Sequence, residues 1–352
     1  MKKAILILLC FAMLVIAVSC NDDNNVGEVE TSQSVPSSSE KDNHTSGSQE
    51  TTTGILPDAL KESPISDFEY ELNENGTITI TKYIGTDEIV VIPNKIENRD
   101  VTEIGSMCFF EMTNIKHITV ANSVTIIGFS AFKSSSIITV NLSEQTSIIK
   151  NAAFMDCINL CNISLPNSLL EIGSSAFENC RSLKQITIPA NVTSWGTDSF
   201  ANSGLEKLHL SEGLVYIPEN SFLGTQIKEL QFPSSIEIIK WQAFGNCAKL
   251  ESIILNYGLI TISDSAFAAN SNLTQIIIPK TVTTITECSF SACSNLQKVM
   301  FDGNAPKTYE KVDTLTGEVW KPSIHVPYTV YYHSDATGFT SPQWFGYATE
   351  IW

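Results

Sequence analysis

A single phenylalanine recurs along the middle of this sequence with a period of 22 or 23 residues. The nine positions are Phe109, Phe132, Phe154, Phe177, Phe200, Phe222, Phe244, Phe267 and Phe290. A period this short and this strictly kept is typical of a solenoid, in which one supersecondary unit stacks on the next. Because each unit buries its apolar face only against its neighbours, the repeat predicts one continuous core and a long, regular surface.

Each repeat carries one short strand followed by a turn. The apolar anchors after the phenylalanine read Leu-x-x-Ile-x-Ile-Pro, as in residues 183–189. The two isoleucines share one face of a strand, and proline ends the strand because it lacks a donor for the ladder. A second short extended piece follows and leads to an apolar residue. A glycine often comes next, and we expect the chain to turn there, as at Gly105, Gly128, Gly173 and Gly196.

The shorter repeats lose one residue in the loop after the phenylalanine and never in the strand. The first strand anchor comes five residues after Phe132, at Ile137, but six residues after Phe244, at Leu250. A deletion inside a strand would turn every later side chain to the other face, whereas a loop tolerates it. We therefore expect the strands to keep one register.

The first 64 residues lie outside the repeat. Residues 1–19 combine two lysines with an apolar run of about fifteen residues, which predicts a signal peptide and is shorter than a membrane span of about 20 residues. The stretch Ala17-Val18-Ser19-Cys20 resembles a bacterial lipobox, and this resemblance implies acylation of Cys20. A simple cleaved signal and an uncleaved anchor are the alternatives. Residues 20–64 are polar and poor in large apolar side chains, which predicts a disordered tether to the lipid.

The charge balance argues against a polyanionic partner. The chain has 38 acidic and 21 basic residues, a formal net charge of −17, and the basic residues are scattered. A surface that binds phosphates needs clustered lysine and arginine. We therefore expect no nucleic-acid binding, and membrane contact only through the N-terminal lipid.

Four cysteines are locked to the phase of the repeat. Cys157, Cys180, Cys247 and Cys293 each stand three residues after a repeat phenylalanine. We interpret them as small buried side chains in a ladder. Neighbouring turns about 4.8 Å apart leave a Cys157–Cys180 disulfide open as an alternative. The sequence has no CxxC and no Cys/His cluster with zinc spacing, so we expect no metal site.

The repeat unit and both ends resemble one known family. The segment Ala-Phe-x-Asn-Cys-x-x-Leu-x-x-Ile-x-Ile-Pro at 176–189 is similar to the BspA-like, or treponemal-type, leucine-rich repeat. The segment from Phe68 to Pro93 resembles that family's N-terminal cap and predicts a hairpin on the Asn75-Gly76 turn, where both residues would adopt positive φ. A mostly β leucine-rich-repeat solenoid of about nine repeats is thus expected at 104–302. An N-terminal cap is expected at 65–103 and a C-terminal cap at 303–352. The resemblance also implies a bacterial surface protein that adheres to host matrix proteins, host cells or other bacteria.

No pattern in the sequence points to catalysis. GxSxG, HExxH, the P-loop, GxGxxG and the EF-hand loop are all absent from the sequence. His117 and His209 fall on outward strand positions four turns apart, too far to share a metal. We therefore expect neither an enzyme nor a cofactor.

The outward positions of the strands offer a candidate recognition surface. In the central repeats they are polar with little charge, and we interpret eight of them as binding residues: Asn162, Ser164, Gln185, Thr187, Lys207, His209, Glu229 and Gln231. In the last three repeats one outward column is apolar and consists of Ile254, Ile277 and Met300. Three interpretations of this apolar column stay open: a cover formed by the C-terminal segment, a partner-binding patch, or a misassigned strand phase.

These patterns favour an exported, non-catalytic binding protein, and the resemblances to a lipobox and to the BspA-like family imply that it is lipid-anchored to the bacterial outer membrane or cell surface. We expect an adhesin that engages a protein or glycan on a host or bacterial surface. The alternative is a structural or assembly lipoprotein of the bacterial envelope without a host ligand.

Overall fold

The structure is a computed structural model that describes residues 61–286, 288–308, 311–312, 319–320 and 328–352. The predicted signal peptide, Cys20 and the tether up to residue 60 lie outside the described residues. The folded unit begins before residue 65, where the tether was predicted to end. The backbone N–H of Ser63 donates to the carbonyl oxygen of Val91 at 2.9 Å, and the Val91 N–H donates to Ser63 Oγ at 3.0 Å.

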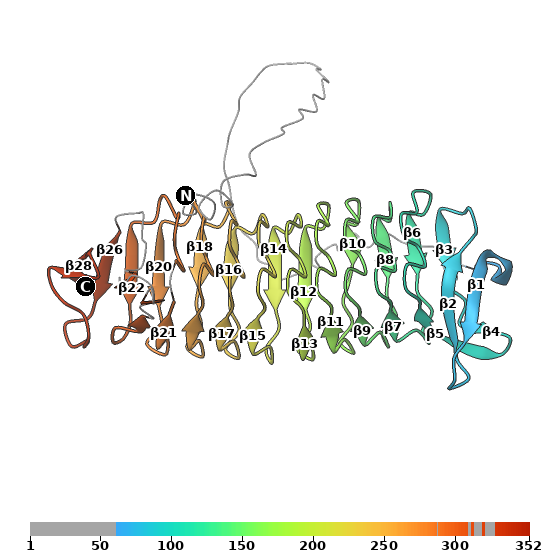
Figure 1. Ribbon diagram of the computed structural model, residues 1–352, viewed down its shortest axis with the longest axis horizontal. Helices are drawn as coiled ribbons and strands as arrows, with labels where there is room; N and C mark the ends of the chain where they lie inside the picture. Colours follow the sequence, from blue (N-terminus) through green and yellow to red (C-terminus); the bar gives the residue numbers. More distant parts are fainter. Residues whose placement is uncertain (1–60, 287, 309–310, 313–318, 321–327) are drawn as a thin grey trace, which may run out of the picture. The chain divides into compact units, whose positions relative to one another are not determined.

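One face of the solenoid is a row of short parallel strands, one from each turn (Figure 1). These strands are β3 (Ile89–Val91), β6 (His117–Thr119), β8 (Thr139–Asn141), β10 (Asn162–Ile163), β12 (Gln185–Ile188), β14 (Lys207–Leu210), β16 (Glu229–Gln231), β18 (Ser252–Ile254), β20 (Gln275–Ile278) and β22 (Lys298–Phe301). We call this row the strand face. Pairs within it keep the expected register: Thr139 lies opposite both His117 and Asn162, across a 22-residue and a 23-residue repeat.

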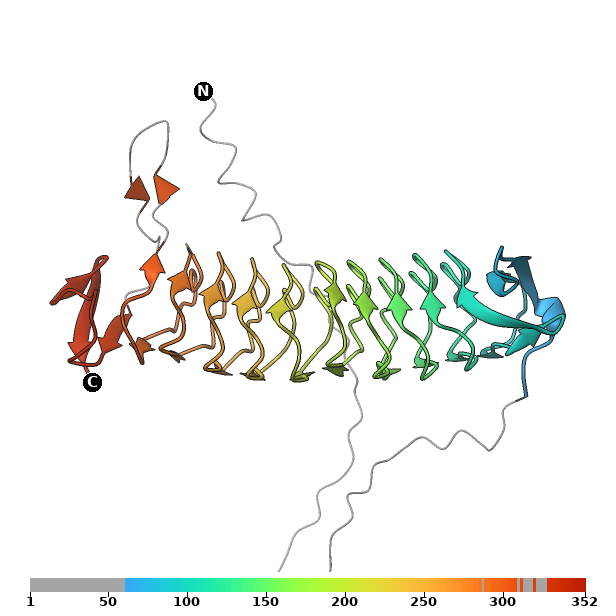
Figure 2. The ribbon, with the colours of Figure 1, turned by 90° about the horizontal axis from the view of Figure 1, so that it is seen from below.

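A second row of strands, two residues long in every turn after β5, follows the turn after each strand of the strand face (Figure 2). It begins at β5 (Arg99–Ile104) and continues through β7 (Ile126–Ile127), β9 (Ile148–Ile149), β11 (Glu171–Ile172), β13 (Ser194–Trp195), β15 (Tyr216–Ile217), β17 (Ile238–Ile239), β19 (Thr261–Ile262), β21 (Thr284–Ile285) and β23 (Lys307–Thr308). Neighbouring strands pair in parallel from β5 to β13 and from β15 to β23. The predicted second extended piece of each repeat is therefore a strand ladder.

The repeat phenylalanines form one continuous stack in the core. From Phe109 to Phe290, successive ring centroids lie 4.9–5.7 Å apart and the ring planes differ by 1–11°. All nine are buried. Tyr83 continues the stack toward the N-terminus, 5.5 Å from Phe109. The core thus runs the length of the repeats, as the period predicts.

The segment around each phenylalanine contains left-handed residues that the sequence did not predict. Positions two before and two after the phenylalanine have positive φ, and all of them except Gly224 carry a side chain, as at Ser175 (56°) and Asn179 (60°) around Phe177. Such a conformation costs about 1–2 kcal/mol for a residue with a side chain. This conformation directs the backbone N–H groups of Ser175, Phe177 and Asn179 at carbonyl oxygens of the next turn, with N···O distances of 2.7–2.9 Å. This third ladder of hydrogen bonds offsets the strain.

The glycines after the second strand have a different role from the predicted one. Gly105, Gly128, Gly173 and Gly196 do not have positive φ. A Cβ at Gly196 would lie 2.3 Å from the backbone nitrogen of Ser174, and one at Gly128 would lie 2.6 Å from the carbonyl oxygen of Ile104. Glycine is present because the previous turn's backbone approaches too closely for a side chain.

The N-terminal cap is built around an antiparallel hairpin, as predicted. After the short helix η2 (Ile65–Asp67), β1 (Phe68–Leu72) pairs with β2 (Ile78–Tyr83). The predicted pair of positive φ angles is wrong: Gly76 has φ +83°, but Asn75 uses its side-chain oxygen to accept from Thr77 N–H at 3.1 Å. β2 pairs in parallel with β5, β4 (Lys95–Ile96) pairs with β5, and β3 pairs with β6. The solenoid therefore starts inside the predicted cap.

At the C-terminal end, the described strands that follow β22 in the ladder extend the strand face and do not cover it. β26 (Thr329–Tyr332) pairs in parallel with β22, and β28 (Tyr347–Ile351) pairs in parallel with β26. β27 (Gln343–Trp344) closes this end antiparallel to β28, while β24 (Lys311–Val312) and β25 (Val319–Trp320) pair with each other. The interpretation that the C-terminal segment lies over the apolar column is wrong for β26 and β28, because their backbones continue the ladder of the last turn. Among the described residues, no helix is long and apolar enough to cross a membrane.

Candidate binding surface

All eight predicted binding residues extend to solvent from the strand face. Between the outward residues of each strand, the middle anchor points inward: Ile186 and Leu230 are buried, and Ile163 and Leu208 are partly buried. The alternation follows from the period of two in an extended strand. The strand phase assigned from sequence is therefore confirmed, and the possibility of a misassigned phase is removed.

The structure places some of these eight residues directly opposite one another. Gln185 pairs with Lys207 and Thr187 pairs with His209 across β12 and β14. Glu229 and Gln231 lie on β16, whose ladder partner is β18. Asn162 is opposite Thr139 on β8. Among the described strands, ladder pairing is interrupted between β10 and β12 and between β14 and β16. The eight residues thus lie on one face but belong to three ladder segments.

A hollow lies at the edge of this surface, where β8 and β10 end. It has a volume of about 480 Å³ and is lined by Asn141, Glu144, Asn162, Ser164 and neighbouring residues. Two of the predicted binding residues therefore border a concave site. Amide, hydroxyl and carboxylate groups there can donate and accept hydrogen bonds.

The apolar column is largely open to solvent. Ile254 is 62% exposed and Ile277 is 48% exposed, while Met300 is partly buried. Ile277 lies opposite Met300, and Met300 lies opposite Tyr331 of β26. The column is therefore extended by a tyrosine, which Lys298 contacts with its ammonium 5.8 Å from the ring centroid. An exposed apolar row of this kind is available to a partner.

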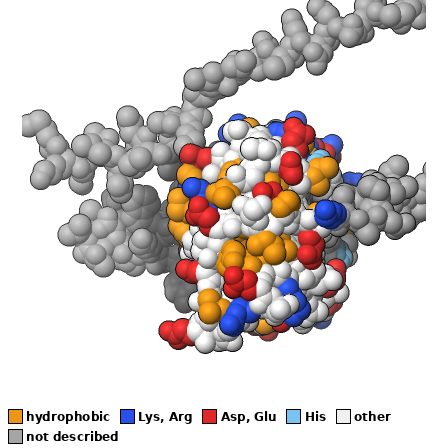
Figure 3. Space-filling model, turned by 90° about the vertical axis from the view of Figure 1, so that its right-hand side faces the viewer, with side chains coloured by type: hydrophobic (Ala, Val, Ile, Leu, Met, Phe, Trp, Pro, Cys, Tyr) orange, Lys and Arg blue, Asp and Glu red, His pale blue; other side chains and the backbone are white. Residues whose placement is uncertain are grey.

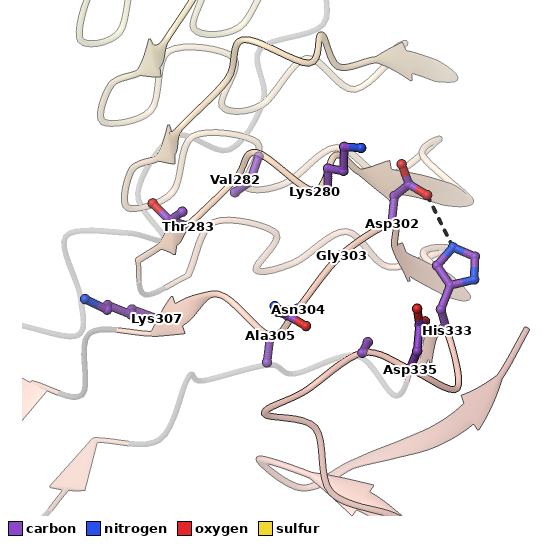
Figure 4. A pocket seen from close by; sticks show the side chains of 11 residues that line it. Lys280, Val282, Thr283, Asp302, Gly303, Asn304, Ala305, Lys307, His333 and Asp335 are labelled. Atoms are coloured by element: carbon purple, nitrogen blue, oxygen red, sulfur yellow. Dashed lines mark hydrogen bonds and ion pairs between the residues drawn. The ribbon is translucent and has the colours of Figure 1, made fainter.

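A larger hollow lies at the C-terminal end, where the sequence indicated no site. It has a volume of about 760 Å³ and contains residues from three neighbouring turns, with Lys280, Asp302 and His333 among its lining (Figure 4). His333 Nε2 lies 3.2 Å from Asp302 Oδ1. Its partner is 31 residues away, and no repeat pattern brings the two together.

The surface charges do not gather into one basic patch on the N-terminal end. Figure 3 shows acidic, basic and apolar side chains interspersed there. Ion pairs such as Lys95–Asp100 and Lys184–Glu206 are exposed. Isolated exposed pairs contribute little to stability, and mixed charge does not steer a polyanion.

The cysteines of the repeat are buried donors, which is more specific than the predicted apolar role. The Sγ–H of Cys157 donates to the carbonyl oxygen of Phe132 at 2.9 Å, and that of Cys180 donates to Phe154 at 3.2 Å. Asn270 occupies the same repeat position and donates to the carbonyls of two phenylalanines. Cys157 and Cys180 are free thiols, so the alternative of a disulfide between them is not realised. Burial raises the pKa of Cys157 to about 11, which makes this thiol a poor nucleophile.

The described residues contain no group of three or more histidine, cysteine or acidic side chains that could hold a metal ion. His117 and His209 lie on β6 and β14, with three strands between them. Cys20 lies outside the described residues, so its lipidation remains a prediction from sequence.

A family model and several solved structures are similar to this chain. The model of the BspA type leucine rich repeat region matches residues 90–206 and 196–312. The chain is similar to a leucine-rich repeat protein from Bacteroides ovatus, with 24% identity and a TM-score of 0.64 over 83% of this chain and 77% of that one. It is also similar to the T. pallidum leucine rich repeat protein, with 23% identity and a TM-score of 0.48 over 60% and 91% of the two chains.

A third similar structure is the pneumococcal vaccine antigen PcpA, with 19% identity and a TM-score of 0.42 over 79% of this chain and 94% of that one. The similarity to the Bacteroides ovatus protein shows a shared fold. No curated protein matches the sequence.

Proposed function

The chain belongs to the BspA-type leucine-rich repeat proteins, and we propose that it is a non-catalytic adhesin that binds its partner through the strand face. The leucine-rich-repeat solenoid is typically a binding scaffold, and proteins of this family are generally secreted or surface-exposed. The observation that carries the proposal is the exposure of all eight outward polar residues from β10 to β16 on one regular face.

The chemistry of this face favours a protein or glycan surface as the partner. Its side chains are amides, hydroxyls, one histidine, one lysine and one glutamate, so uncharged hydrogen-bonding side chains outnumber charged ones. Hydrogen-bonded recognition depends less on ionic strength than phosphate recognition does. We therefore expect affinity to fall only modestly between 50 and 300 mM salt.

Anchoring at the cell surface completes the proposal. Acylation of Cys20 would tie the chain to the outer membrane, and the polar stretch after it would hold the solenoid away from the lipid headgroups. With an r.m.s. reach on the order of 35 Å for about forty coil residues, such a tether would make the strand face accessible from outside the cell.

Two experiments test the proposal. An array of matrix proteins and glycans probed with the full-length protein should identify a ligand, whose binding should be lost when the protein is denatured. Protease treatment of intact cells should release fragments of the solenoid. If the protein resists protease until the cells are lysed, the chain faces inward, and the structural envelope lipoprotein becomes the better explanation.

A further inference from the structure

The 760 Å³ hollow at the C-terminal end has the composition of a ligand site. Its polar lining comes from Lys280 and Thr283 on one turn, Asp302 and Asn304 on the next, and His333 and Asp335 after β26 (Figure 4). Val282, Ala305 and Ala336 supply the apolar part. A concave site with a few converging polar groups and an apolar portion is the usual form of a small-ligand pocket.

One wall of the hollow is held in place before any ligand arrives. Asp302 accepts a hydrogen bond from the hydroxyl of Tyr257 at 3.2 Å on one oxygen, and its other oxygen lies 3.2 Å from His333 Nε2. The ring of His333 stacks on Trp352 at 4.9 Å, with 26° between the planes. Figure 4 shows the Asp302 and His333 side chains pointing toward one another. A wall fixed by contacts from four segments costs little ordering entropy on binding.

Among the polar side chains of the lining, Lys280 and Asp335 remain available to a ligand. Lys280 and Asp335 are exposed, and neither has an ion-pair partner within the described part of the chain. The ammonium of Lys280 offers three donors and the carboxylate of Asp335 offers only acceptors. A ligand that contacts both must accept a hydrogen bond from the ammonium and donate one to the carboxylate, and hydroxyl groups can do both.

The charge of the lining selects against ionic ligands. The lining contains two lysines (Lys280 and Lys307) and two aspartates (Asp302 and Asp335), so their formal charges cancel. A polyanion would approach the aspartates and a polycation the lysines, and each like-charge contact would weaken binding. The chain's net charge of −17 disfavours acidic ligands further.

Exposed aromatic rings flank the fixed wall. Tyr257 is 65% exposed and Trp352 is 46% exposed, and each contacts a residue of the wall. The negative face of an aromatic ring attracts the weakly positive C–H groups of a sugar ring. From the charge balance, the paired donors and acceptors and these rings, we infer that the hollow binds a neutral saccharide, with the next sugar of a chain lying against Tyr257 or Trp352.

The test measures binding of the full-length protein, purified in mild detergent, to a panel of neutral hexose and N-acetylhexosamine oligosaccharides. Sialylated and sulfated counterparts form the second arm, and unglycosylated matrix peptides form the third. At least one neutral oligosaccharide should bind. Its affinity should fall about tenfold or more in Lys280→Gln and in Asp335→Asn, because each change removes a charge-assisted hydrogen bond while preserving size.

Matched controls separate this site from the strand face. Lys249→Gln alters an exposed lysine in a turn that does not line the hollow, and the double variant Thr187→Trp/His209→Trp alters the strand face. Both should bind the neutral oligosaccharide as the wild type does. The inference is overturned if no neutral saccharide binds, if only acidic glycans or peptides bind, or if Lys280→Gln and Asp335→Asn bind it unchanged. None of these outcomes bears on ligand binding by the strand face.

Discussion

The ring of Phe132 lies 5.1 Å from the ring of Phe154, and their planes differ by only 1°. The two residues are one repeat apart, so each turn places the same ring on the ring before it. Offset-stacked aromatic pairs add about 0.5–1.5 kcal/mol to the free energy gained by burying their area. This relationship, continued along the repeats, makes the phenylalanine stack the main determinant of the core.

We expect Phe177→Ala to lower the free energy of unfolding by about 3–5 kcal/mol, because it leaves a cavity between two stacked rings in the middle of the array. Phe290→Ala, at the end of the stack, should cost less, since each turn contacts only its neighbours. Urea unfolding followed by circular dichroism measures both. A loss below about 1 kcal/mol at Phe177 would mean that the stack contributes little.

Because several thiols are buried, we expect the free energy of unfolding to fall at alkaline pH. Burial raises the pKa of Cys157 and Cys247 from 9.0 to about 11, so the folded chain keeps these protons at pH values where the unfolded chain releases them. Their stabilising contribution is complete below pH 9. Between pH 9 and 11 this contribution should decline by up to about 1.4 kcal/mol for each thiol and for each pH unit.

Denaturant unfolding from pH 8 to 10.5 tests this decline, with Cys157→Ser as the matched control. The serine hydroxyl should still donate to the carbonyl oxygen of Phe132, and it does not titrate in this range. The variant should therefore match the wild type near pH 8 and lose less stability above pH 9. The same pH dependence in both proteins would show that Cys157 is not protected by burial.

We expect Cys20 to carry fatty acid. Wild-type protein should partition into detergent and label with palmitate in growing cells, whereas Cys20→Ala should accumulate as a soluble or precursor form. Lys249→Ala, an exposed change in the solenoid, should label as the wild type does. A wild-type protein without label would exclude the lipid anchor.

The sequence predicted the repeating parts of the fold because the same physical constraint acts at every turn. The spacing from Phe177 to Phe200 and the alternation around Ile186 were enough to assign the core and the outward face. The left-handed residues were missed because Ser175 and Asn179 carry no glycine signal. Their conformation is stabilised by hydrogen bonds to the next turn, which a single repeat does not reveal.

The two ends of the solenoid were predicted less well, and the hollow at the C-terminal end was not predicted. Both depend on contacts between segments that share no sequence pattern. Tyr257 reaches Asp302 across 45 residues, and Asp302 reaches His333 across 31. One of the three interpretations of the column Ile254, Ile277 and Met300 made the C-terminal segment its cover. Two aromatic residues of that segment, Phe339 and Trp344, instead contact each other and Phe301 of β22.

The most direct test of binding by the strand face is the affinity of the full-length double variant Thr187→Trp/His209→Trp for the ligand that the array identifies. The two residues lie opposite one another on β12 and β14, so two bulky rings would block the centre of the surface. Thr193→Trp/Glu237→Trp, at exposed positions beside β13 and β17, is the matched control. With melting temperatures unchanged, we expect the strand-face variant to bind at least about tenfold more weakly and the control to bind normally. Equal affinity in the two double variants would contradict recognition through the strand face.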